Sequence, residues 1–194
     1  LRRMVLAMGL GALALMADPE PAIAGRAVAL LESLSDGLSA AAGDTPAAAL
    51  FAVPGWRREK LQMMRWWMRD RPADPALVEG ALARALADPD WELAVTATLA
   101  AGSLRLTNLR HAVAGARLPE TKTEGVTHDE ARMILALRDA TLVRLGGPTG
   151  KALPPGIEAV LDGDPDGLPS ALRDTAAALC QPLPVSTAPD PTPG

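Results

Sequence analysis

The chain has 194 residues, 48% of them apolar, which is enough for one domain with a hydrophobic core. Its net charge of −4 gives no overall attraction to nucleic acid or to an anionic membrane. Ala and Leu dominate the apolar residues, Tyr is absent and Phe occurs once, so the composition predicts an all-α fold. The single cysteine, Cys180, cannot form an internal disulfide, which favours a reducing, cytoplasmic compartment.

The N-terminal stretch "LRRMVLAMGLGALALMA" has two arginines followed by an apolar run over residues 4–17. This run is too short to span a bilayer, so we expect no membrane span. Asp18-Pro19 follows directly and is suited to cap the next helix. We therefore expect residues 1–17 to form a buried first helix. The alternative is a secretory signal peptide, which would make the protein exported.

Asp-Pro pairs at 18–19, 74–75 and 88–89 each precede an Ala-rich run. The aspartate accepts free backbone N–H groups at a helix start, and proline is tolerated in the first turn. A capping box begins at Thr127, and Gly146-Gly147-Pro148 predicts the end of that helix. Helices are predicted over residues 1–17, 19–35, 46–52, 56–71, 75–87, 89–101, 104–115, 128–145, 156–162 and 169–180.

The C-terminal residues 181–194, "QPLPVSTAPDPTPG", are rich in proline and carry too few apolar residues to build a core. They are predicted to be a tail or an interdomain linker. The remaining residues, 1–180, are predicted to form one helical domain.

Two segments share a pattern of apolar and small residues after a capping aspartate. Ile23, Ala24 and Ala27 follow Asp18 at the same offsets at which Leu93, Ala94 and Ala97 follow Asp88. This pattern resembles the second helices of HEAT-type repeats, although the family usually has Arg where Ala24 and Ala94 stand, and the two copies are 70 residues apart. The resemblance implies an irregular HEAT-like helical repeat, or α-solenoid, in which small residues let stacked helices approach.

The stretch "WRREKLQMMRWWMRDR" at 56–71 is the most unusual segment of the chain. On a helical wheel Leu61, Met64, Trp67 and Met68 share one broad arc, and Trp66 lies on the far side. Two opposed apolar faces indicate a central helix whose arginines pair with the nearby carboxylates of "DPDWE". The alternative is a basic surface that binds nucleic acid. The residues that would serve it are Arg57, Arg58, Lys60, Arg65, Arg69 and Arg71.

The sequence favours no catalytic site. His111 and His128 belong to no pair at metal-ligand spacing, and Cys180 has no histidine nearby in the sequence. The segment "GGPTGKA" at 146–152 lacks the first glycine and the Ser or Thr of a phosphate-binding loop. We therefore expect a protein that is not an enzyme and has no cofactor.

The segment "DGDPDGLPSALRD" at 162–174 resembles the first half of an EF-hand loop, with Asp162, Asp164 and Asp166 at alternating positions. Arg173 stands where that motif requires a bidentate Glu. An acidic loop between helices, with no calcium binding tighter than about millimolar, is therefore expected.

Together these features predict a non-enzymatic scaffold that binds a protein partner or an adjoining domain of its own chain. The alternatives are a nucleic-acid-binding helical repeat, which the overall charge disfavours, and an exported helical protein.

Overall fold

The computed structural model describes residues 26, 46–52, 54, 57–69, 71–72, 74–119, 123, 125–148, 153–164, 168, 173–174, 176 and 179. Within these residues the fold is helical and contains no strand, as the composition predicts. None of the helices in this part of the chain is both long enough and apolar enough to cross a bilayer. The predicted helices over 1–17 and 19–35 and the tail over 181–194 lie outside the described residues, apart from Arg26, which is helical.

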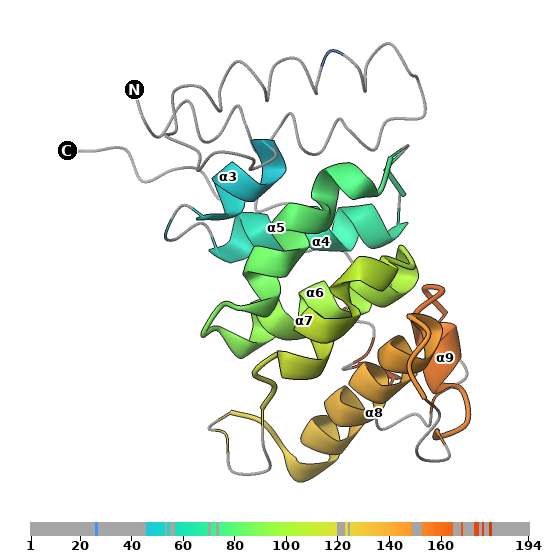
Figure 1. Cartoon of the computed structure of the whole chain (residues 1–194). Coiled ribbons are helices and arrows are strands. Elements are labelled where there is room, and N and C mark those ends of the chain that lie inside the picture. The colour runs from blue at the N-terminus through green and yellow to red at the C-terminus, as the bar shows by residue number, and fades with distance from the viewer. Residues whose placement is uncertain are drawn as a thin grey trace, which may run out of the picture.

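The described helices follow one another from the top to the bottom of Figure 1 approximately in chain order. Apart from the helix predicted over 104–115, their bounds agree with the predicted ranges to within a few residues. They are α3 (Pro46–Ala52), α4 (Arg57–Arg69), α5 (Ala76–Leu86), α6 (Trp91–Ser103), the 3-10 helix η1 (Thr107–Leu109), α7 (Arg110–Gly115), α8 (His128–Arg144) and α9 (Ile157–Val160).

Aspartate side chains accept backbone N–H groups at the starts of α5 and α6, though not always from the predicted residue. The Asp74 carboxylate accepts the amide N–H of Ala76 at 3.0 Å, as expected for the Asp-Pro pair before α5. Before α6 the cap is Asp90 instead of Asp88, and the helix begins at Trp91. Asp88 accepts the N–H of Asp90, which in turn accepts the N–H of Glu92. Two consecutive aspartate turns thus shift the start by two residues from the predicted 89.

The capping box at the start of α8 is confirmed, since Thr127 and Glu130 each accept the other's backbone N–H. The same helix ends as predicted: Gly146 has φ +83°, and the N–H of Gly147 donates to Leu142 O at 2.7 Å. Both bonds of a Schellman motif are present, because the N–H of Gly146 donates to Val143 O.

The predicted helix over 104–115 is wrong in its first part. Leu104 and Arg105 instead close α6 in a second Schellman motif, in which the N–H of Leu106 donates to Ala101 O and that of Arg105 to Gly102 O. Arg105 occupies the left-handed position with φ 57°, which glycine usually takes. The chain then continues through η1 into α7.

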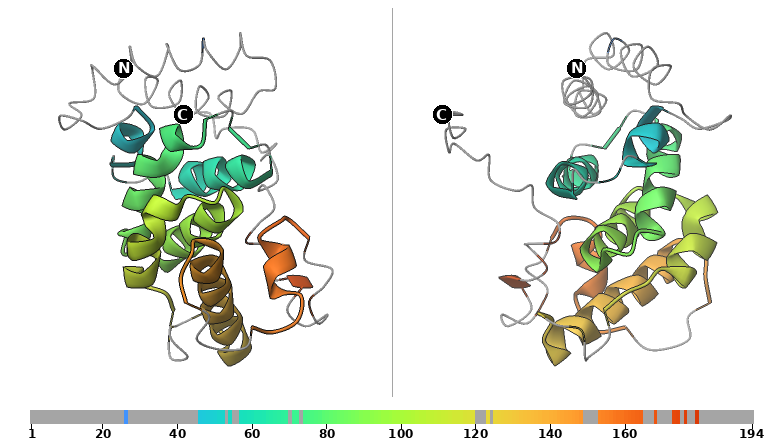
Figure 2. Two further views of the ribbon diagram at one scale, coloured as in Figure 1. Left: turned by 45° about the vertical axis from the view of Figure 1, so that its right-hand side comes forward. Right: turned by 90° about the vertical axis from the view of Figure 1, so that its left-hand side faces the viewer.

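The most deeply enclosed of these helices is α6, not the basic helix α4. Residues 93–103 are all buried, and a helix that is apolar all round belongs inside a core. Leu93 and Ala97 face a first apolar cluster with α3, α4 and α5, and Val95 and Leu99 face a second cluster with α8 and α9. Both views of Figure 2 accordingly show α6 between α4 and α8.

Gly102 lies where α6 meets the second cluster. A Cβ atom at this position would come 2.8 Å from Thr141 Oγ1 and 3.3 Å from Leu161 Cδ2. The absence of a side chain therefore permits the close approach of α8 and of the segment that follows α9. Of the predicted helix over 169–180, the described positions Arg173, Asp174, Ala176 and Leu179 are helical.

Candidate functional site

Two arginines of the basic helix α4 form ion pairs with carboxylates at the start of α6. Arg57 donates hydrogen bonds to both Asp90 and Glu92, and Arg65 Nη2 donates to Glu92 Oε1 at 3.1 Å. The hydrogen bond to Asp90 is the main reason that the pKa of Arg57 is raised. Arg65 is only 2% exposed, so its guanidinium lies inside the protein. These ion pairs are the ones predicted between the helix and the "DPDWE" carboxylates.

Lys60 is a second buried cation of the same helix. Its Nζ lies 6.0 Å from the centroid of the Phe51 ring, within the range of a cation–π contact. Burial lowers the pKa of Lys60, and the negative charge of Asp88 opposes this shift. The Phe51 ring also stacks on Trp67, with 5.6 Å between the ring centroids. Trp67 is fully buried, as its position on the apolar arc predicts.

The six basic residues proposed for nucleic-acid binding therefore do not form one surface. Lys60 and Arg65 are buried, and Arg57 is paired with carboxylates. The three remaining residues are exposed: Arg58, Arg69 and Arg71. Trp66, on the opposite side of the helix, is half-buried and packs on the first cluster. The buried cations and both tryptophans support packing as the main role of this helix.

In the acidic loop, one of the three aspartates that resemble EF-hand ligands forms an ion pair with an arginine. Asp162 accepts two hydrogen bonds from Arg144, at 2.7 and 2.9 Å, and these lower the pKa of Asp162. Asp164 is exposed, and Asp166 lies outside the described residues. Arg173 Nη2 donates to Leu168 O at 3.4 Å, so the arginine at the position of the motif's Glu reaches the loop backbone.

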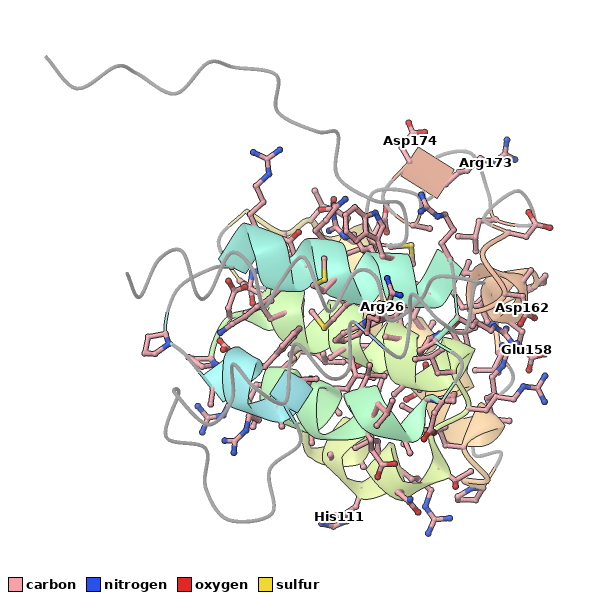
Figure 3. All side chains as sticks on the ribbon, turned by 90° about the horizontal axis from the view of Figure 1, so that it is seen from above. Arg26, His111, Glu158, Asp162, Arg173 and Asp174 are labelled. Atoms are coloured by element: carbon pink, nitrogen blue, oxygen red, sulfur yellow. The ribbon has the colours of Figure 1, made fainter. Side chains whose placement is uncertain are left out.

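The described residues contain no group of three or more His, Cys, Asp and Glu side chains that could hold a metal ion. His111 and His128 are both exposed, and Figure 3 shows His111 on a different edge of the molecule from Asp162 and Glu158. Cys180 lies outside the described residues. The absence of catalysis and of tight calcium binding stays a prediction.

The sequence did not predict an open groove beside α8. It encloses about 580 Å³ and is lined by residues 116–119, Thr123, Leu135 and Arg138. Residues 116–119 follow α7 as non-helical backbone, and Ala116 is extended, with φ −63° and ψ 137°. No sequence motif links the Leu118-Pro119 pair to Arg117 and Arg138, so only the folded chain brings these residues together.

The chain matches no protein-family model, no curated protein and no solved structure.

Proposed function

We propose that this chain is a non-enzymatic, HEAT-like helical scaffold that binds a protein partner or an adjoining domain of its own chain. The observation that carries the proposal is the order of packing. Along the chain α3 packs on α5, α4 on α6 and α6 on α8, and the consecutive helices α5 and α6 also pack on each other, so that helices stack against near neighbours in the sequence. Stacking of near neighbours is the arrangement from which helical-repeat proteins build extended binding surfaces.

The charges of α4 support a protein partner over nucleic acid. A nucleic-acid surface requires several cations directed at the solvent along one face. Here two of the six candidates are buried and a third binds Asp90 and Glu92. An interaction module of the cytoplasm also agrees with the single cysteine. An N-terminus at Asp18 in the purified mature protein would instead indicate export.

Selection of a random-peptide library on the immobilised full chain tests the scaffold function. We expect enriched peptides that bind with a Kd of about 100 µM or tighter, the range of transient interaction modules. A helical protein of unrelated sequence serves as the control. If no peptide binds the chain better than this control, the scaffold proposal is overturned.

A salt titration tests the nucleic-acid alternative with a short DNA duplex. Counterion release makes such binding fall steeply as salt rises. Tight binding with a steep salt slope, reduced by replacing Arg58, Arg69 and Arg71 with glutamate, would establish the alternative and reject our proposal. We expect binding to be absent at physiological salt.

A further inference from the structure

Arginines from the ends of three helices surround the carboxylate of Asp162. Arg71 follows α4, Arg105 follows α6, and Arg144 is the last residue of α8. The hydrogen bonds from Arg144 are the main reason that the pKa of Asp162 is lowered, and the charges of Arg105 and Arg71 add to this effect. Asp162 itself follows α9, is exposed and lies at one edge of the molecule (Figure 3). The folded chain thus gathers these residues at one place on the surface.

Two of these three arginines have no close counter-charge. Arg144 is neutralised by its ion pair with Asp162. Arg71 and Arg105 are both exposed, and neither forms a side-chain hydrogen bond or an ion pair with a described residue. Among the described residues, Asp162 is the only carboxylate whose charge interacts with either of them, and it is already bonded to Arg144. The surface around Asp162 therefore keeps an excess of positive charge.

Arg105 occupies its position at a cost in backbone energy. Its φ of 57° lies in the left-handed region, which glycine adopts more easily than any residue with a Cβ. The end of α6 is closed by the backbone N–H groups of residues 105 and 106, and a glycine at 105 would form the same bonds. The guanidinium of Arg105 is therefore not needed to end the helix. A strained residue whose side chain the fold does not require points to a function of that side chain.

The group already held in this cluster indicates what the exposed arginines can bind. A guanidinium and a carboxylate form two parallel hydrogen bonds, and Arg144 and Asp162 do so here. Arg71 and Arg105 offer the same kind of donor to the solvent on the same part of the surface. Carboxylates of another chain would complement these two positive charges.

We propose that Arg71 and Arg105 dock an acidic segment of a protein partner, an inference that rests on the scaffold function proposed above. Carboxylates of the segment bind the two exposed guanidinium groups, while Asp162 stays bonded to Arg144. The negative charge of Asp162 opposes the incoming carboxylates, so it weakens the docking. Binding of this kind is moderate in affinity and reversible, as a transient interaction module requires.

Fluorescence anisotropy with the full chain at low salt tests the proposal. The probe is a peptide of about ten residues that alternates glutamate and serine and carries an uncharged fluorophore. A second peptide has glutamine in place of glutamate. We expect the acidic peptide to bind at least about tenfold more tightly, because hydrogen bonds between charged groups are the stronger ones. Its binding should weaken as salt rises, since exposed charges are screened.

Arg105→Gly separates a role in binding from a role in the fold. It should make the fold more stable, because it relieves the strained φ, and yet weaken binding of the acidic peptide by about threefold to fivefold. Arg71→Gln should weaken binding by a similar factor, and the double variant by about tenfold. Arg132→Gln, on an exposed part of α8, is the matched control and should leave binding unchanged.

Asp162→Asn gives a test in the opposite direction. It removes the charge that opposes the ligand and leaves Arg144 able to bind it as a third arginine. We expect this variant to bind the acidic peptide at least about threefold more tightly than the natural chain. A damaged fold would not produce such a gain, and thermal melts of every variant check that each is folded.

Failure of this docking surface and failure of the scaffold give different results. If the acidic peptide does not bind, or binds the double variant as well as it binds Arg132→Gln, the docking proposal is overturned. Library-selected peptides that bind the double variant as well as the natural chain would also overturn it, but would leave the scaffold function intact with its site elsewhere. A DNA duplex that displaces the acidic peptide and does not bind the double variant would overturn the proposal in favour of nucleic acid.

Discussion

Replacing Gly102 with alanine tests how tightly α6 packs on α8. The new Cβ would lie 2.8 Å from Thr141 Oγ1, 3.1 Å from Thr141 Cγ2 and 3.3 Å from Leu161 Cδ2. Thr141 is fully buried and its hydroxyl lies 3.5 Å from Thr98 O, so its side chain has no solvent space into which it could rotate. The clash must instead be relieved by a movement of α8 or of the segment after α9.

Two opposing terms set the size of the effect. Alanine is favoured over glycine inside a helix by about 1 kcal/mol. Overpacking of a filled core costs about 1–3 kcal/mol, and contacts near 2.8 Å belong to the upper part of that range. We therefore expect Gly102→Ala to lower the free energy of unfolding by about 1–2 kcal/mol.

Gly115→Ala is the matched control, because a Cβ at this last residue of α7 meets no atom within 4 Å. It should change the free energy of unfolding by between zero and about +1 kcal/mol. Thr141→Ala removes both threonine atoms that the Cβ of residue 102 would strike. In that background we expect the cost of Gly102→Ala to fall by at least about 1 kcal/mol.

Urea denaturation followed by tryptophan fluorescence measures all four variants, with the slope m showing whether the native state has changed. The reasoning is refuted if Gly102→Ala is as stable as Gly115→Ala. It is refuted equally if the effects of Gly102→Ala and Thr141→Ala add without coupling.

Four further predictions concern other residues. Trp67→Ala should lower the free energy of unfolding by about 3–5 kcal/mol. Trp67→Phe should lower it by much less, since the indole Nε1 of Trp67 has no acceptor among the described residues. Equal melting midpoints for Trp67→Ala and the natural chain would contradict this. Arg105→Gly should raise the free energy of unfolding by about 0.5–1 kcal/mol in urea, because φ 57° strains any residue with a Cβ; a loss would contradict it. Because the pKa of Asp162 is lowered, its ion pair with Arg144 stabilises the folded state at every pH above the ordinary Asp pKa of about 4. This stabilisation is lost as the pH falls through the lower pKa of the folded state. The difference in free energy of unfolding between Asp162→Asn and the natural chain should therefore disappear in acid. Calorimetric titration of the metal-stripped chain should show no calcium binding tighter than about millimolar, and a micromolar isotherm that Asp162→Ala abolishes would overturn this.

Sequence patterns predicted the helices well where local chemistry determines them. Thr127 with Glu130, and Gly146 with Gly147, act through neighbouring backbone groups, so their roles follow from spacing alone. The burial of Trp67 followed from the apolar arc of a strongly patterned helix.

Features that depend on competing or distant groups were not predicted. Asp88 and Asp90 can both cap a helix, and only the folded chain shows that Asp90 does so. Arg105 takes a position that the usual preference assigns to glycine, and the predicted helix therefore began too early. The groove joins Arg117 to Arg138, which become neighbours only after α7 and α8 have packed.

The enclosed position of α6 has a consequence for how this protein unfolds. Where the repeats of a helical-repeat protein are only weakly coupled, the end units can open while the middle stays folded. Here one helix supplies side chains to both apolar clusters, Leu93 and Ala97 to the first and Val95 and Leu99 to the second. If either cluster comes apart, one face of α6 is exposed to solvent. The other cluster then loses support, because it is packed on the same helix. The amide protons of α6 should exchange with solvent only when the whole described core opens, as a single cooperative unit.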